Sequence, residues 1–192
     1  MKNLSNQHKG SLLAFVAVML ITPDSIFIRL SNIETWGMLF YRGAIPFVVV
    51  LAGLIFFYKN NLFKALVNIG YPGIFYVISF SICNITFIIS IQNTNVANTL
   101  VMIAMAPMLS AILGSIFLKE IPDRKTWIAI IITLLSVTYI FHDSMEMGNF
   151  YGDLFGIITS FGLACNAVIA RFAKNRDLVP SAVIGKLCVA IF

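Results

Sequence analysis

The sequence predicts an all-α integral membrane protein in which several helices cross the bilayer. Hydrophobic residues make up 59% of the 192 residues and charged residues only 11%, and the mean hydropathy is +0.93. So little polar material cannot cover a water-soluble globule of this size. The apolar residues also gather in runs of about 20, the length that a helix needs to cross the hydrocarbon core.

The apolar runs predict six complete spans and part of a seventh. No small-residue cleavage site follows the first run, so we expect it to stay in the protein as a helix and not to be removed as a signal peptide. Only short polar loops separate the runs. The spans are expected at residues 11–30, 37–58, 70–91, 95–118, 125–141 and 152–172, with an incomplete run at 179–192.

The positive charges predict the orientation. With the N-terminus in the cytoplasm, ten Lys and Arg residues fall on the cytoplasmic side and only Arg29 falls outside. Basic residues near short loops are retained in the cytoplasm. We therefore expect a protein integral to the plasma membrane, in bacteria the inner membrane, with a cytoplasmic N-terminus. The net charge of +5 then reflects topology and indicates no nucleic-acid partner.

The chain carries a weak internal repeat. The stretch GSLLAFVAVMLITPDSIFIRLSN aligns without a gap with GDLFGIITSFGLACNAVIARFAK, which places Asp24 over Asn166. With two extra loop residues, Arg42 falls over Lys186, each a lone base in the following span. Because an odd number of spans separates the copies, they have opposite orientations. Inverted repeats are typical of secondary transporters.

Asp24 and Arg42 are expected at matching depths, about 9 Å below the outer ends of the first two spans. A charge there costs on the order of 2.5–3.5 kcal/mol if it faces lipid unrelieved. Two interpretations remain open. The residues form an ion pair that locks the two spans, or they line a solute path, where Asp24 takes up a proton. Pro23 frees the carbonyl four residues back and is expected to kink the helix.

Other polar residues within the spans extend this candidate pathway. Asn84 and Asn98 need hydrogen-bond partners, which a neighbouring helix or a polar solute could provide. Asn166 joins them as the repeat counterpart of Asp24. Pro107 lies in the middle of the fourth span, where we expect a second kink.

Small residues recur at every fourth position in the fourth and sixth spans. They are Ala106, Ser110 and Gly114, and Gly152, Gly156 and Ser160. This spacing allows helix backbones to approach closely, and we expect close packing, with a sliding contact between two halves as the alternative. Glu120 follows the fourth span in a charged cytoplasmic loop. It belongs either to a solvated cluster or to a cytoplasmic gate.

An enzyme is disfavoured, because no set of acids, His or Cys residues converges on a reaction centre. Asp24 is the only acid that we expect to be buried. The three cysteines, Cys83, Cys165 and Cys188, have neither CxxC spacing nor a nearby His, so we expect buried thiols. We expect no cofactor and no metal ion.

Residues 93–140, NTNVANTLVMIAMAPMLSAILGSIFLKEIPDRKTWIAIIITLLSVTYI, resemble the end of the first repeat of the EamA family in the drug/metabolite transporter superfamily. The similar features are a polar start, Pro107, an LxE ending at Glu120 and Trp127; FYRG at 40–43 is also similar. The resemblance implies ten helices in two inverted five-helix repeats, with both termini inside and a solute pathway between them.

On this basis we expect a cytoplasmic segment at 1–10, a first repeat at 11–141 and the start of a second at 150–192. The chain would be the N-terminal portion of a secondary transporter that moves small metabolites by alternating access. Its partners would be the lipid bilayer and a small-molecule solute, with proton or ion coupling and the oligomeric state left open. The alternatives are a membrane anchor or assembly subunit that transports nothing, or a truncated remnant.

Overall fold

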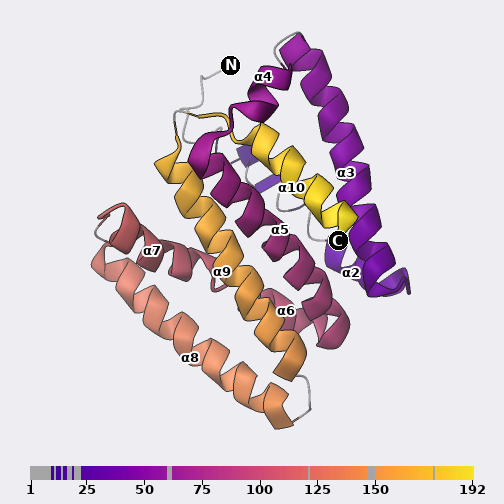
Figure 1. Cartoon of the computed structure of the whole chain (residues 1–192). Coiled ribbons are helices and arrows are strands. Elements are labelled where there is room, and N and C mark those ends of the chain that lie inside the picture. The colour runs from indigo at the N-terminus through magenta and orange to yellow at the C-terminus, as the bar shows by residue number, and fades with distance from the viewer. Residues whose placement is uncertain are drawn as a thin grey trace, which may run out of the picture. The chain divides into compact units, whose positions relative to one another are not determined.

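The structure is a computed structural model that describes residues 10, 12–13, 15–16, 19, 23–59, 62–120, 122–146, 150–174 and 176–192. The side chains of residues 140–141 and 143–146 are not described. Within these ranges the regular structure is entirely helical (Figure 1). The predicted all-α membrane fold is therefore confirmed.

The chain divides into two units, residues 1–33 and 34–192. The first contains α2 (Asp24–Leu30), which covers the last part of the predicted span at 11–30; most of the rest of that span lies outside the described residues. The helices of the second unit are α3 (Thr35–Tyr58), α4 (Leu62–Val67), α5 (Gly70–Asn93), α6 (Val96–Ile103), α7 (Ala106–Phe117), α8 (Arg124–Glu146), α9 (Phe150–Phe172) and α10 (Val179–Ile191).

Four segments of the second unit are long and apolar enough to cross a membrane. They are α3, α5, α6 with α7, and α9, which correspond to the predicted spans at 37–58, 70–91, 95–118 and 152–172. The predicted span at 125–141 lies within the helix α8. The run at 179–192 forms α10, a shorter apolar helix.

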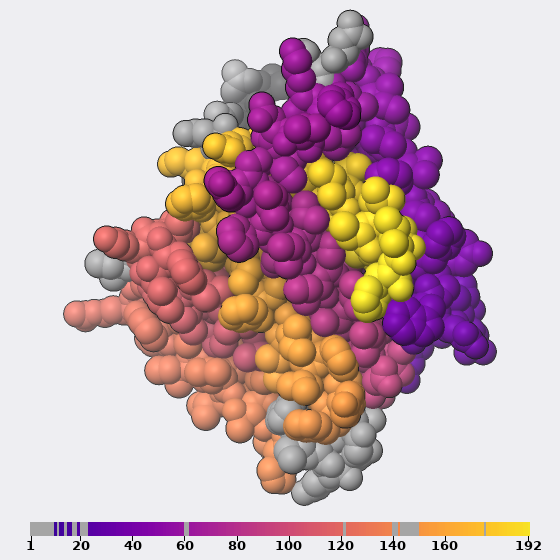
Figure 2. Space-filling view, in the orientation of Figure 1, coloured from indigo at the N-terminus to yellow at the C-terminus, as the bar shows by residue number. Residues whose placement is uncertain are grey.

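Helix α5 is the centre of the second unit. It packs along α9 on one side, and α10 lies between α5 and α3 (Figures 1 and 2). The start of α3 lies beside the end of α5, as the hydrogen bond that Thr35 donates to Gln92 shows. The rings of Trp36 and Phe192 lie 5.5 Å apart, so the start of α3 meets the end of α10. α3 and α10 are therefore antiparallel, and both flank α5.

Exposed Lys119, Lys174 and Arg176 lie where α7 and α9 finish and α10 begins. We call this the basic end of the unit. α3 finishes at the same end, since Tyr58 and Arg176 line one pocket there. At the opposite end α3 begins and α5 and α10 finish.

The distribution of side chains suits a lipid environment. Large apolar residues lie on the outside, as Phe56 and Tyr71 show with 76% and 82% exposure. Much of the polar surface is buried between helices instead, with Ser90, Thr99 and Thr159 at 1% exposure or less. Because lipid offers no hydrogen bonds, polar groups gain by facing neighbouring helices.

Two of the predicted small residues bring α9 against the end of α5 and against Met102 near the end of α6. A Cβ atom added to Gly152 would lie 2.6 Å from the backbone N of Thr94, and one added to Gly156 would lie 3.0 Å from Cβ of Met102. Ser160 is fully buried on the same helix. Of the three in α7, Ser110 and Gly114 are buried and Ala106 is half-buried.

Candidate solute pathway

Two positively charged side chains meet α5 from its two flanking helices. The guanidinium Cζ of Arg42 in α3 lies 5.2 Å from the ring centroid of Phe87. The Nζ of Lys186 in α10 lies 5.2 Å from the ring centroid of Phe80 and donates a hydrogen bond to Oδ1 of Asn84 at 2.6 Å. The two lone bases that the repeat alignment pairs therefore contact the same helix.

Their contacts on α5 lie on one face of that helix. Phe80, Asn84 and Phe87 are separated by four and three residues, the spacing that stacks side chains on one side of an α-helix. Nδ2 of Asn84 donates to the carbonyl of Phe80 at 2.8 Å. Neighbouring groups of the protein thus provide partners for both ends of the Asn84 amide. We call Arg42, Lys186 and these three residues the cationic face.

A row of short polar side chains fills the contact between α5 and α9. The hydroxyl oxygens of Thr86 and Thr159 lie 2.7 Å apart. Ser79 donates to the carbonyl of Gly162 at 3.0 Å, and the thiol of Cys83 lies 3.6 Å from the carbonyl of Thr159. These five residues form a polar seam that the sequence reasoning missed, apart from the expected burial of Cys83.

At the basic end, Arg171 of α9 joins the end of α7. Its Nη1 donates to Oε2 of Glu120 at 2.7 Å. Its Nη2 donates to the carbonyl oxygen and to Oγ of Ser110, at 3.0 and 2.5 Å. Gly114 leaves room for this arrangement, since a Cβ there would lie 3.3 Å from Oε2 of Glu120. We call Glu120, Ser110 and Arg171 the arginine clamp.

The predicted fourth span is two helices and not one. α6 ends at Ile103 and α7 begins at Ala106, with Pro107 in its first turn. Pro107 has no N–H to donate to the carbonyl of Ile103, which removes a hydrogen bond that would continue the helix. The break lies at the level of a cluster of buried methionines, Met102, Met105 and Met108.

The remaining predicted residues are not brought together. Pro23 precedes α2, and its carbonyl accepts the N–H groups of Ile26 and Phe27 at 3.1 Å. Asp24 begins α2 in the first unit and is half-buried, whereas Arg42 belongs to the second unit. The ion pair between them therefore stays a prediction.

Two asparagines of the second unit lie on different helices. Asn98 is half-buried on α6. Asn166 is buried on α9, where its Oδ1 has no hydrogen-bond partner among the described residues. The structure gives no common site for them.

The expectation that Asp24 is the only buried acid is wrong. Asp153, in the first turn of α9, has an exposure of 0%. Neither carboxylate oxygen has a hydrogen-bond partner among the residues that the structure describes. Gly152 and Gly156 lie on both sides of it in sequence and bring this end of α9 close to its neighbours, which explains the burial. In the sequence, the glycines on both sides of Asp153 were the signal that could have predicted its burial.

The cysteines also differ from expectation. Cys83 is buried and Cys165 is half-buried, but Cys188 is exposed on the outer surface of α10. The expectation of burial is therefore wrong for Cys188. A thiol on a lipid-facing surface is tolerated because it behaves as a small hydrophobe.

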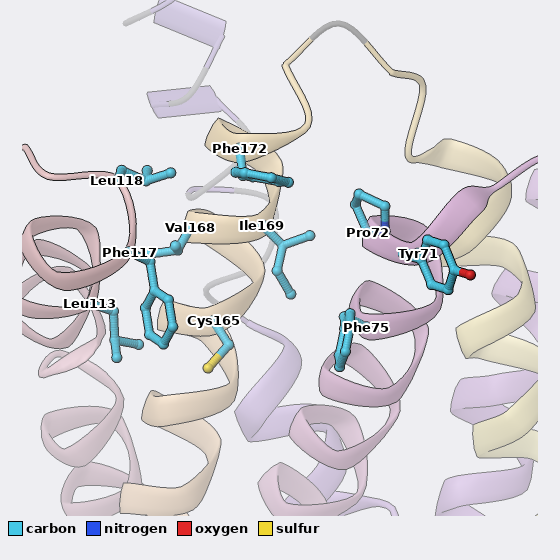
Figure 3. A pocket seen from close by; sticks show the side chains of 10 residues that line it. All are labelled: Tyr71, Pro72, Phe75, Leu113, Phe117, Leu118, Cys165, Val168, Ile169 and Phe172. Atoms are coloured by element: carbon cyan, nitrogen blue, oxygen red, sulfur yellow. The ribbon is translucent and has the colours of Figure 1, made fainter.

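An apolar groove of about 480 Å³ opens at the basic end between α5, α7 and α9 (Figure 3). Its walls include Phe75 of α5, Phe117 of α7 and Cys165 of α9, with Leu118 and Phe172 near the clamp. The lining has almost no polar surface. The groove and the cationic face meet different sides of α5, since Phe75 and Phe80 are five residues apart and point in directions about 140° apart around the helix axis.

Long apolar helices with polar contacts between them define a polytopic α-helical membrane protein. A profile of the EamA-like transporter family matches residues 8–142, which is more than half of the chain. The chain belongs to the EamA-like transporter family, and the resemblance seen in its sequence is confirmed. This is a family of transporters and not of enzymes, so a transporter-like membrane role follows in general terms. Comparison with curated proteins and with solved structures gave no match.

Proposed function

We propose that the chain works in a secondary transporter that moves a small metabolite by alternating access between two inverted repeats. The observation that carries this proposal is the antiparallel packing of α3 against α10 beside α5. The repeat alignment makes α3 and α10 equivalent, and each places one cation, Arg42 or Lys186, over α5. Two equivalent helices of opposite direction around one central helix are what an inverted repeat produces.

In this proposal the first repeat extends over 11–141 and the second begins at 150. The basic end faces the cytoplasm, because Lys119, Lys174 and Arg176 lie there. The N-terminus is then cytoplasmic, and the chain is integral to a plasma membrane, in bacteria the inner one. The lipid bilayer covers the exposed apolar side chains.

The arginine clamp is suited to be the cytoplasmic gate. It joins α7 of the first repeat to α9 of the second through the ion pair of Glu120 and Arg171, whose side chains are 52% and 41% exposed. An ion pair this exposed contributes only about 0.2–1 kcal/mol, so it can open and close during a transport cycle. The break between α6 and α7 supplies a hinge in the same span.

Metabolite exchange tests the proposal. Liposomes containing the purified chain are loaded with a mixture of small metabolites, and mass spectrometry records which compounds leave faster than from protein-free liposomes. We expect selective release, slowed in Glu120→Gln and unchanged in Asp123→Asn, which alters an exposed acid outside the clamp. Release no faster than from protein-free liposomes would show that this chain does not transport by itself.

A further inference from the structure

The two cations of the cationic face lie at different depths along α5. Arg42 comes seven residues after the start of α3 and Lys186 seven residues after the start of α10. On α5, Lys186 contacts Phe80 and Asn84 near the middle of the helix, whereas Arg42 contacts Phe87, six residues before its end. Arg42 is therefore nearer the end opposite the basic end. Phe80 and Phe87 are seven residues apart, so Lys186 lies about 10 Å further from that end.

The helices that form this face carry a net positive charge. α3, α5 and α10 contain no Asp or Glu, and Arg42 and Lys186 are their only Lys or Arg residues. A cation within the membrane is costly and marks a substrate or ion pathway. An anionic group brought to this face lowers the cost, whereas a cationic group raises it.

The surrounding groups hold both cations in place over α5. A cation over an aromatic ring is attracted by the ring's negative face, and Phe80 and Phe87 provide the two rings. Oδ1 of Asn84 accepts from Lys186 at 2.6 Å. An ammonium and a guanidinium positioned in this way are the usual protein donors to carboxylate and phosphate oxygens.

We propose that the cationic face binds an anionic oxygen group, a carboxylate or a phosphate, of the transported solute. Arg42 is the contact nearer the end opposite the basic end, and Lys186 is the contact near the middle of α5. The solute class is therefore a small organic anion. This inference rests on the proposed transport function, since it assigns the substrate class of the same pathway.

Binding to the purified full chain in detergent tests the substrate class without requiring transport. Succinate is compared with succinamide, and glycerol 3-phosphate with glycerol, by isothermal titration calorimetry. The first pair tests for a carboxylate site and the second for a phosphate site. We expect at least one anion to bind roughly ten- to a hundred-fold more tightly than its neutral partner, the ratio expected of charge-assisted hydrogen bonds. Equal affinity within both pairs overturns the proposal.

Variants assign the binding to the cationic face. Arg42→Gln and Lys186→Gln are expected to weaken anion binding about ten-fold each, whereas Lys186→Arg keeps the charge and retains binding. Lys64→Gln, an exposed position on α4, is the matched control. If Lys64→Gln weakens binding as much as Lys186→Gln, the effect is one of net charge and the site assignment is wrong. Thermal unfolding identifies any variant that fails to fold, in which case the Lys186→Arg comparison decides.

The two proposals fail in different ways. Anion binding at the cationic face without metabolite release leaves the anion site standing and contradicts transport by this chain. Release of neutral or cationic metabolites without anion binding supports transport and overturns the anion site.

Discussion

Arg171 and Glu120, 51 residues apart in sequence, are joined by a hydrogen-bonded ion pair of 2.7 Å at the basic end. The contact connects α9 with the segment that follows α7. In the repeat alignment, α9 is the first helix of the second copy, and α7 belongs to the fourth predicted span of the first copy. Arg171 also donates to Ser110, so the clamp holds α7 at two levels. A cytoplasmic gate needs such a reversible polar contact.

Opening the clamp is expected to expose Cys165. This thiol lines the groove whose walls at Leu118 and Phe172 adjoin the clamp, and Cys83→Ala with Cys188→Ala leaves it as the single thiol. In Glu120→Gln, a membrane-impermeant maleimide should label Cys165 faster by at most about five-fold, because an exposed ion pair contributes no more than about 1 kcal/mol. Asp123→Asn is the matched control. Equal labelling in both variants would show that the ion pair does not restrict access to the groove.

Gly152 is expected to tolerate no side chain. A Cβ atom there would lie 2.6 Å from the backbone N of Thr94 and from the backbone carbon of Asn93, and backbone atoms cannot move aside as a side chain can. Gly152→Ala should lower the free energy of unfolding in mixed micelles by about 1–3 kcal/mol, as overpacking does.

Gly53 provides the matched control, because a Cβ on it would meet no atom within 4 Å. Gly53→Ala should raise the free energy of unfolding by about 0.5–1 kcal/mol, since alanine loses less backbone freedom than glycine in a helix. A destabilisation of similar size in both variants would contradict the close contact at Gly152.

The hydroxyls of Thr86 and Thr159 are expected to couple α5 to α9 only modestly. Each hydroxyl also bonds a carbonyl one turn back in its own helix, that of Ile82 or Phe155, so valine at one position leaves the other satisfied. A double-mutant cycle of Thr86→Val and Thr159→Val should give a coupling free energy of about 0.6 kcal/mol. The same cycle with Thr138, which is exposed on α8, should give none when paired with Thr159.

The helices themselves were predictable from the sequence, because lipid imposes a length and an apolar character on each span. The close approach of α9 also follows a local pattern, since Gly152 and Gly156 are spaced by one helical turn. Pro107 correctly indicated that the fourth span is not a continuous helix, although it could not indicate that α6 and α7 would separate at Ala104 and Met105.

The contacts between distant residues were not predictable in the same way. Arg171 was predicted to be a cytoplasmic charge and the repeat counterpart of Arg29, and nothing local associates it with Ser110 or Glu120. Gly152 and Gly156 indicate close packing around Asp153, but the segments that bury its carboxylate are set by tertiary packing, which the sequence of one helix does not contain. Polar residues between membrane helices acquire their roles from tertiary packing, and hydropathy does not record that packing.

We expect the buried carboxylate of Asp153 to lower the free energy of unfolding. It is 0% exposed, and neither of its oxygens has a hydrogen-bond partner among the described residues. A buried, unsatisfied polar group costs about 1–3 kcal/mol, and a charged one costs more. Asp153→Asn removes the charge with little change of shape, so the free energy of unfolding at neutral pH should rise by about 1–3 kcal/mol.

The control for this change is Asp123→Asn, which neutralises an exposed acid and should alter the free energy of unfolding by less than about 0.5 kcal/mol. Chemical unfolding in mixed micelles measures both variants on the same scale. A loss of stability in Asp153→Asn would show that the carboxylate has a favourable partner in the membrane-embedded protein. Asp153 would then be a structural anchor for the start of α9, and the gain expected from removing its charge would be absent.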